Sequence, residues 1–158
     1  MLEDGDTMKT GFQLKYLWHD IDVYEFEATA SNGQFSGAAK AYVPIGGLAE
    51  AAASLEGFPR HVSDAREIQL GAFGREFAGG GVSLRFFCKD SSGHAVVEFR
   101  FESEDESNTG SRWNLPEQTA HFFAGIEATA VDEFVGELRR LEENKSGIAL
   151  LRFHLPEL

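Results

Sequence analysis

Cysteine is almost missing from this sequence, which has one, Cys88, in 158 residues. A single thiol excludes an intramolecular disulfide and is typical of a protein from a reducing compartment. The acidic start, residues 1–6, lacks the basic region and the apolar run of a signal peptide. No apolar run approaches the roughly 20 residues that a membrane-spanning helix needs. We therefore expect a cytoplasmic protein that does not associate with membranes.

Basic residues are also few: 14 Lys and Arg stand against 26 Asp and Glu, which gives a net charge of −12. Such a charge opposes non-specific binding to nucleic acid and to anionic lipid, because like charges repel over a Debye length of about 8 Å. We expect no nucleic-acid partner. The acidic surface suits a basic protein partner, or it serves only solubility.

The common catalytic and cofactor motifs are lacking as well. The sequence has no Gly-rich phosphate loop ending in Gly-Lys-Ser/Thr, no His-Glu-x-x-His and no Gly-x-Ser-x-Gly. Five glycines within residues 71–81 match no dinucleotide fingerprint and indicate a wide, flexible connection. His19, Asp20 and Asp22 are candidate metal ligands, but Asp is favoured in turns for its backbone hydrogen bonds, and we interpret them as a turn. We expect no catalytic residue, no metal site and no cofactor.

What the sequence does contain, above all, is alternation with a period of two between Gly81 and Ser103. Apolar residues occupy every second position before and after a polar break at 90–93, which predicts a β-hairpin with one buried face. That face comprises Val82, Leu84, Phe86, Cys88, Ala95, Val97, Phe99 and Phe101. We expect Cys88 to be a small core residue. The 14 Phe predict an aromatic-rich core.

The same patterns predict further strands at 12–18, 24–30, 35–43, 66–71, 121–128 and 148–155, and helices near 47–56 and 131–143. Asn32-Gly33 predicts a hairpin with a type I′ turn. Gly57 is expected to end the first helix, and Thr129 with Asp132 resembles a capping box for the second. Small residues on one face of the third strand would let another backbone or a helix lie close: Gly37, Ala39 and Ala41.

Together these elements predict a single α+β domain over residues 11–158 after a flexible leader, 1–10. Its order is βββ-α-ββββ-α-β, an antiparallel sheet of about seven to eight strands packed with two α-helices.

Several landmarks resemble a known group. They are Phe35-Ser36-Gly37 at the start of a strand, a helix followed by Phe58-Pro59, a strand ending at Leu70-Gly71, a hairpin turning at Gly93-His94, and a late helix with Phe134, Leu138 and Leu141. Over roughly residues 12–142 the chain resembles small, mostly uncharacterised bacterial β-rich domains. Some of these are immunity proteins encoded beside polymorphic toxins, the WapI-immunity-like group. The resemblance implies a binding role and no chemistry.

The candidate binding residues are acidic or lie off the main apolar face. Residues 102–110 have no periodicity and predict a solvated acidic loop. The acidic candidates are Glu98, Glu102, Glu104, Asp105 and Glu106, and we interpret Glu98 and Glu102 as parts of a solvated strand face paired with Arg100. Phe87 and Phe123 point away from the main apolar face. They are either covered by loops and a second sheet, the alternative we favour, or they mark an exposed binding patch. His94 follows Gly93 at the hairpin tip, where it would be a catalytic base, a contact residue or simply a polar residue of the loop tip. We favour the loop-tip interpretation and keep His94 among the binding candidates.

The sequence therefore favours a non-enzymatic binding protein, an immunity-type inhibitor that masks a basic partner such as a toxin domain. The alternative is a small-molecule-binding or enzymatic domain with a pocket between the sheet and the helix at 131–143, where Gly37, Ala39 and Ala41 would make room for a ligand. A third reading is a self-associating module, a homo-oligomer.

Overall fold

The computed structural model describes residues 10–74, 79–92 and 94–154. Nine residues of the expected leader, and the hairpin residue Gly93, lie outside the described residues. The elements are β1 (Gly11–His19), β2 (Val23–Ser31), β3 (Ser36–Pro44), α1 (Gly47–Leu55), β4 (Ala65–Gly71), β5 (Gly81–Cys88), β6 (Ala95–Glu102), the short 3₁₀ helix η2 (Glu106–Asn108), β7 (Thr119–Ile126), α2 (Ala128–Asn144) and β8 (Ile148–Leu151). The predicted class and order, βββ-α-ββββ-α-β, are confirmed.

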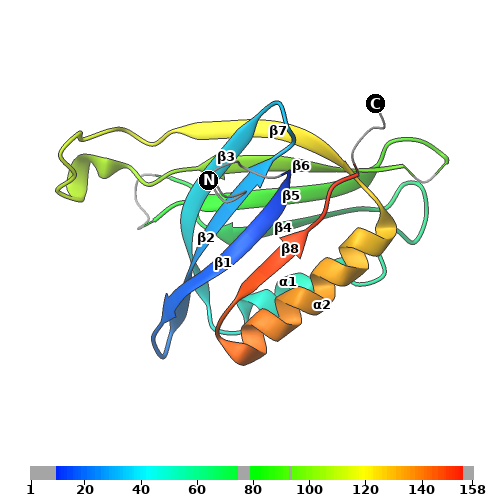
Figure 1. Ribbon diagram of the computed structural model, residues 1–158, viewed down its shortest axis with the longest axis horizontal. Helices are drawn as coiled ribbons and strands as arrows, with labels where there is room; N and C mark the ends of the chain where they lie inside the picture. The colour runs from blue at the N-terminus through cyan, green and yellow to red at the C-terminus, as the bar shows by residue number, and fades with distance from the viewer. Residues whose placement is uncertain (1–9, 75–78, 93, 155–158) are drawn as a thin grey trace, which may run out of the picture.

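The eight strands form two antiparallel sheets of four strands each (Figure 1). The first sheet has the order β3-β2-β1-β8 and the second the order β4-β5-β6-β7. Their inner faces meet in an aromatic core, where the ring of Phe12 on β1 stacks on that of Phe99 on β6 with 5.6 Å between centroids. The core therefore lies between the sheets.

Both helices pack at one side of this core (Figure 1), with α2 beside β8 and α1 beside α2. The apolar stripe predicted for α2 is confirmed, since all five of its residues are buried: Val131, Phe134, Val135, Leu138 and Leu141. Burying a side chain of this size fully contributes roughly 1.5–3 kcal/mol. The ring of Phe134 meets Phe12 edge-on at 5.8 Å, so α2 and the sheets share one core.

The ends of the helices differ in part from prediction. Gly57 follows α1 with a φ of +77°, as expected of a glycine that ends a helix. The capping box at Thr129 and Asp132 is wrong, because α2 begins at Ala128 and its N-cap is Glu127, with no side-chain capping bond. The strand before it ends at Ile126, so the helix starts earlier than the first residue of its apolar stripe.

The hairpin between β2 and β3 is confirmed, but its predicted turn type is wrong. Gly33 has a φ of +90°, whereas Asn32 does not have the positive φ that a type I′ turn requires. Instead, Oδ1 of Asn32 accepts hydrogen bonds from the amides of Gln34 and Phe35, at 2.9 and 2.8 Å. The side chain thus mimics a backbone turn in a four-residue loop.

The turn predicted at Asp20 is confirmed. Its Oδ1 accepts hydrogen bonds from the amides of Asp22 and Val23, at 2.8 and 2.9 Å. These bonds, that from Val23 foremost, lower the pKa of Asp20. The carboxylate therefore serves the turn.

The small residues of β3 lie where the two sheets come together. A Cβ atom on Gly37 would lie 2.7 Å from Cδ1 of Phe101 on β6. Ala41 forms a parallel bridge with Gly80, whose amide donates to the carbonyl of Lys40 at 2.8 Å. The predicted close approach of another backbone is confirmed. Among the described residues, no helix combines the length and the apolar character needed to span a bilayer.

Candidate functional site

The acidic residues at the end of β6 and directly after it accept hydrogen bonds that hold local structure together. Oε1 of Glu102 accepts a hydrogen bond from the amide of Gly74 at 2.5 Å, and Oε1 of Glu104 accepts one from the amide of Gly79 at 3.0 Å. Two segments distant in sequence are thereby joined to the end of β6. The carboxylates are acceptors within the fold as well as surface charges.

The next two acids order the loop itself. Oδ1 of Asp105 accepts from the amide of Ser107 at 2.9 Å and so caps η2, an element that the sequence pattern did not predict. Glu106 accepts a hydrogen bond from the hydroxyl of Ser111, and its amide donates to the carbonyl of Leu115 at 2.8 Å. The predicted loop is therefore structured by its own acids.

Two of these acids line a groove between β3 and the segment 103–118, which we call the acidic groove. It encloses about 480 Å³. Its charged residues are Glu25, Glu27, Glu104, Glu106 and Lys40, so four carboxylates face one ammonium group. The groove thus concentrates negative charge in a concave surface.

The register of the first sheet explains how Glu25 and Glu27 enter the acidic groove. Glu25 pairs with Tyr42, and Glu27 with Lys40, on the neighbouring strand β3. Burial raises the pKa of Tyr42, and the charges of Glu25 and Glu104 raise it further. Sequence reasoning missed Glu25 and Glu27 because alternation shows that they face outward but not what lies across from them.

Glu98 is not on a solvated face, and that prediction is wrong. Only 7% of the residue is exposed. Its carboxylate accepts hydrogen bonds from Nε of Arg85 at 2.7 Å and Nη2 of Arg100 at 3.5 Å, and it lies 2.6 Å from Nε2 of His121. The predicted charge pairing is present, but the site is shielded because Glu98 stands on an inner strand between Arg85 and Phe123 in register.

Burial of Glu98 acts to raise its pKa, but the hydrogen bonds from Arg85 and His121 outweigh it and hold the pKa below the ordinary value. The carboxylate is therefore ionised at neutral pH and is compensated within the fold. It offers little charge to a partner.

Phe87 and Phe123 lie on the outer face of the second sheet, and the first sheet packs on the opposite face. The favoured expectation, that loops and a second sheet cover both rings, is wrong for Phe123, which is 45% exposed. Phe87 is half-buried and carries the guanidinium of Arg85 over its ring at 4.4 Å. The two rings flank an open groove.

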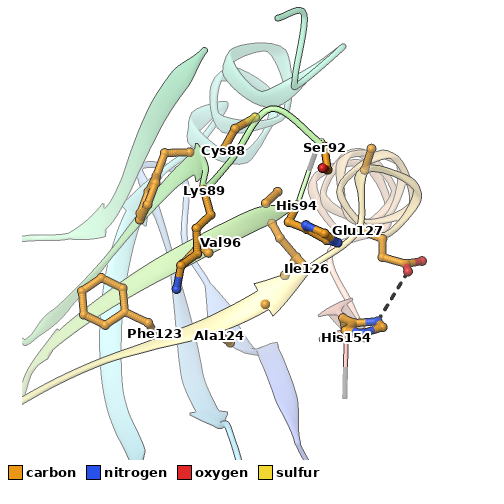
Figure 2. Close-up of a pocket in the computed structure, with 14 residues that line it drawn as sticks. Cys88, Lys89, Ser92, His94, Val96, Phe123, Ala124, Ile126, Glu127 and His154 are labelled. Carbon is orange, nitrogen blue, oxygen red and sulfur yellow. Dashed lines mark ion pairs between the residues drawn. The ribbon is translucent and has the colours of Figure 1, made fainter. Parts of the chain in front are cut away.

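We call this second concavity the sheet-face groove; it encloses about 990 Å³. Phe87, Val96 and Gly125 form one cross-strand row over β5, β6 and β7. Polar side chains stand around it (Figure 2): Lys89, Ser92, His94, Glu127 and His154. The structure therefore brings the predicted residues Phe87 and His94 into one groove, apart from the acidic loop.

Both histidines at the rim of the sheet-face groove contact carboxylates. Nδ1 of His94 lies 2.8 Å from Oδ2 of Asp90, and Nδ1 of His154 lies 3.4 Å from Oε1 of Glu127. The hydrogen bond from His94 is the main cause that lowers the pKa of Asp90. Cys88 also lines the groove; it packs against the core but is only half-buried, so the core prediction holds in part.

Two grooves, of about 500 and 210 Å³, lie along α2 next to β8, and Glu137 and Arg140 line both of them. The sequence pattern predicted a deeper pocket, between the face of the sheet and the helix at 131–143. That space holds the buried face of α2, with Phe134 and Leu138 fully buried. Gly37 likewise faces the ring of Phe101 and the methyl group of Ala120. Within the described part of the chain, no three His, Cys, Asp or Glu side chains gather as metal ligands.

Comparisons of the chain with protein-family models, curated proteins and solved structures find no match. The resemblance to the WapI-immunity-like group therefore stays a prediction from the sequence.

Proposed function

We propose that this chain is a non-enzymatic binding protein that engages a basic protein partner through the acidic groove. Its specific form would be an immunity-type inhibitor that masks a basic toxin domain. One observation carries the proposal: four carboxylates and a single lysine share one concave surface. A basic side chain entering it would meet charges of the opposite sign, which steer association and fix the register of the complex.

Two of the four carboxylates are held in place before a partner arrives, and the other two extend from a backbone that the sheet fixes. Glu25 and Glu27 stand on an inner strand of the first sheet, and Glu104 and Glu106 are tied to Gly79 and Ser111. Fixed side chains lose little conformational entropy on binding, so preorganisation adds to affinity.

Aromatic side chains beside the groove suit a lysine or arginine. Trp18 and Tyr42 are the register partners of Glu25 on its two sides, and their rings lie 6.4 Å apart in an edge-to-face arrangement. Trp18 is 42% exposed. A cation next to a carboxylate and an aromatic ring gains both an ion pair and a cation–π contact, the latter about 0.5–1 kcal/mol at exposed sites.

The test is capture of a partner from a lysate of the source organism by three tagged proteins. They are the natural chain, Glu27→Gln/Glu104→Gln in the acidic groove, and the charge-matched control Glu50→Gln/Glu143→Gln on the helices. We expect a basic protein on the natural chain and the control, and its loss from the groove variant. Equal capture by all three would place the interface elsewhere, and capture of no basic protein would contradict the proposal.

With the partner purified, its association rate is measured against salt concentration. The groove variant should associate about five- to tenfold more slowly at low salt and show a flatter salt dependence, because long-range attraction is what it has lost. The immunity-type form requires more: the partner should be toxic when expressed alone and tolerated when co-expressed with this chain. If the captured partner were not toxic, the proposal that this chain binds a basic protein would still hold, but the proposed immunity role would be contradicted.

A further inference from the structure

We propose that the sheet-face groove is a second binding site, for a small organic anion with a flat apolar body. It would bind the apolar body on the row Phe87–Val96–Gly125, and pair the anionic group with Lys89. This site is separate from the acidic groove and does not depend on the partner proposed there.

The groove has the size and lining of a ligand site. Its volume of about 990 Å³ lies at the upper end of the range for small-molecule pockets, which are mostly apolar with a few placed polar groups. The row Phe87–Val96–Gly125 forms the floor of the groove. Gly125 leaves this floor open, since a Cβ atom there would meet only the carbonyl oxygen of His154, at 3.9 Å. The exposed ring of Phe123 stands beside this floor on the same face (Figure 2). A planar group can therefore lie on the sheet against an aromatic wall.

An exposed lysine gives the groove a place for an anion, although the chain as a whole carries −12. Lys89 is exposed and has no ion-pair partner among the described residues, and Figure 2 shows its amine over the sheet between Val96 and Phe123. The acids nearby are engaged, Asp90 with His94 and Glu127 with His154. An anion at Lys89 would form a charge-assisted hydrogen bond without displacing an existing pair.

The edge of the second sheet argues for a small ligand and against an added peptide strand. The amide of His154 already donates to the carbonyl of Gly125 at 2.7 Å. Nδ2 of Asn32 donates to the carbonyl of Phe123 at 2.7 Å. A peptide that extended the sheet at β7 would need these carbonyls as acceptors. The face of the sheet is open, whereas its edge is occupied.

The experiment titrates the ¹⁵N-labelled full chain with 2-naphthoate and, in parallel, with the neutral 2-naphthamide. Chemical-shift changes should centre on Phe87, Val96, Phe123 and Gly125. Lys89→Met should raise the Kd of naphthoate at least tenfold and that of naphthamide less than twofold. The matched control Lys15→Met, an exposed lysine on β1, should change neither.

Gly125→Phe should abolish binding of both probes by filling the floor, with its melting temperature confirming the fold; if it does not fold, Gly125→Val serves the same comparison. The proposal would be overturned by chemical-shift changes elsewhere in the protein, or by equal effects of Lys89→Met and Lys15→Met on the Kd of naphthoate. It would also be overturned if binding did not saturate below a probe concentration on the order of 10 mM, which corresponds to very weak affinity. Normal binding by the folded Gly125 variant would overturn it as well. Glu27→Gln/Glu104→Gln should bind naphthoate like the natural chain, which separates this test from that of the acidic groove.

Discussion

The carboxylate of Glu142 on α2 caps the start of α1 by accepting a hydrogen bond from the amide of Leu48 at 3.0 Å. The same carboxylate accepts from the amides of Ala49 at 3.2 Å and Gly46 at 3.1 Å. The N-cap of α1, Gly46, has no side chain that could do this. One helix thus supplies the acceptor that the first turn of the other lacks.

Replacing Glu142 by Ala should lower the free energy of unfolding by about 1–2 kcal/mol, the usual cost of losing a helix cap. Urea denaturation measures it. The control is Glu143→Ala, since Glu143 is exposed and next in sequence. A loss of equal size in both variants would show that the cap adds nothing and that only helix charge matters.

The ionised carboxylate of Asp64 should stabilise the fold at neutral pH and lose this effect in acid. Arg66 donates to both of its oxygens, at 3.1 and 2.8 Å, and the amide of Arg60 donates at 2.8 Å. The hydrogen bonds from Arg66, foremost, lower the pKa of Asp64 from 3.8 to about 2. A carboxyl group whose pKa is lowered on folding stabilises the fold above its unfolded pKa, and this stabilisation is lost as the pH falls through the folded pKa.

Asp64→Asn should therefore cost roughly 2 kcal/mol at pH 7, and the cost should shrink between pH 4 and pH 2. Urea unfolding at several pH values measures it, with Asp132→Asn, an exposed aspartate of α2, as the control. A cost of Asp64→Asn that stays constant down to pH 2 would contradict the ionised pair.

Sequence patterns predicted the fold well because each element carries its own signal. In β2, for example, Tyr24, Phe26, Ala28 and Ala30 alternate with polar residues, and the buried face follows directly. The division of eight strands between two sheets was not predictable in this way, because it depends on which strands pair across long distances. The pairing of β1 with β8 joins residues more than 130 positions apart, such as Phe12 and Leu151.

The binding surfaces were harder to predict for the same reason. Glu98 and Glu104 look alike in sequence, as acids in or after one strand, but the first is enclosed by Arg85 and His121 and the second reaches a groove. What separates them is the neighbour across the sheet. Alternation gives the face of a residue and says nothing of its cross-strand partners.

Glu98→Gln should lower the free energy of unfolding by about 1–3 kcal/mol at pH 7, because the cations around it lose their anion. Since folding lowers the pKa of Glu98, the stabilisation is present above the unfolded pKa and is lost as the pH falls through the folded one. The difference from the natural chain should accordingly narrow on acidification. Urea denaturation at pH 7 and pH 3 measures both, and binding of a basic partner should not change. If Glu98→Gln abolished binding of the basic partner and left the free energy of unfolding unchanged, Glu98 would be part of the binding interface.

Two glycines on edge strands should respond oppositely to the same substitution. Gly37 on β3 faces the second sheet, and an added Cβ would lie 2.7 and 3.0 Å from two atoms of the buried Phe101 ring and 3.1 Å from the methyl of Ala120. Gly37→Ala should therefore cost about 1–3 kcal/mol, as overpacking does. Gly125 on β7 faces the sheet-face groove, where an added Cβ meets nothing closer than 3.9 Å.

Gly125→Ala should then leave stability unchanged or raise it by about 0.5–1 kcal/mol, because alanine has less backbone freedom to lose on folding. Paired urea denaturations of the two variants measure the contrast. Both residues sit in the outermost strand of a four-stranded sheet, so strand propensity alone predicts equal effects. A difference in sign would come from what lies above each Cα atom, a packed ring for Gly37 and open groove for Gly125. Equal losses would mean that the floor of the sheet-face groove is closed, and that no ligand could rest there.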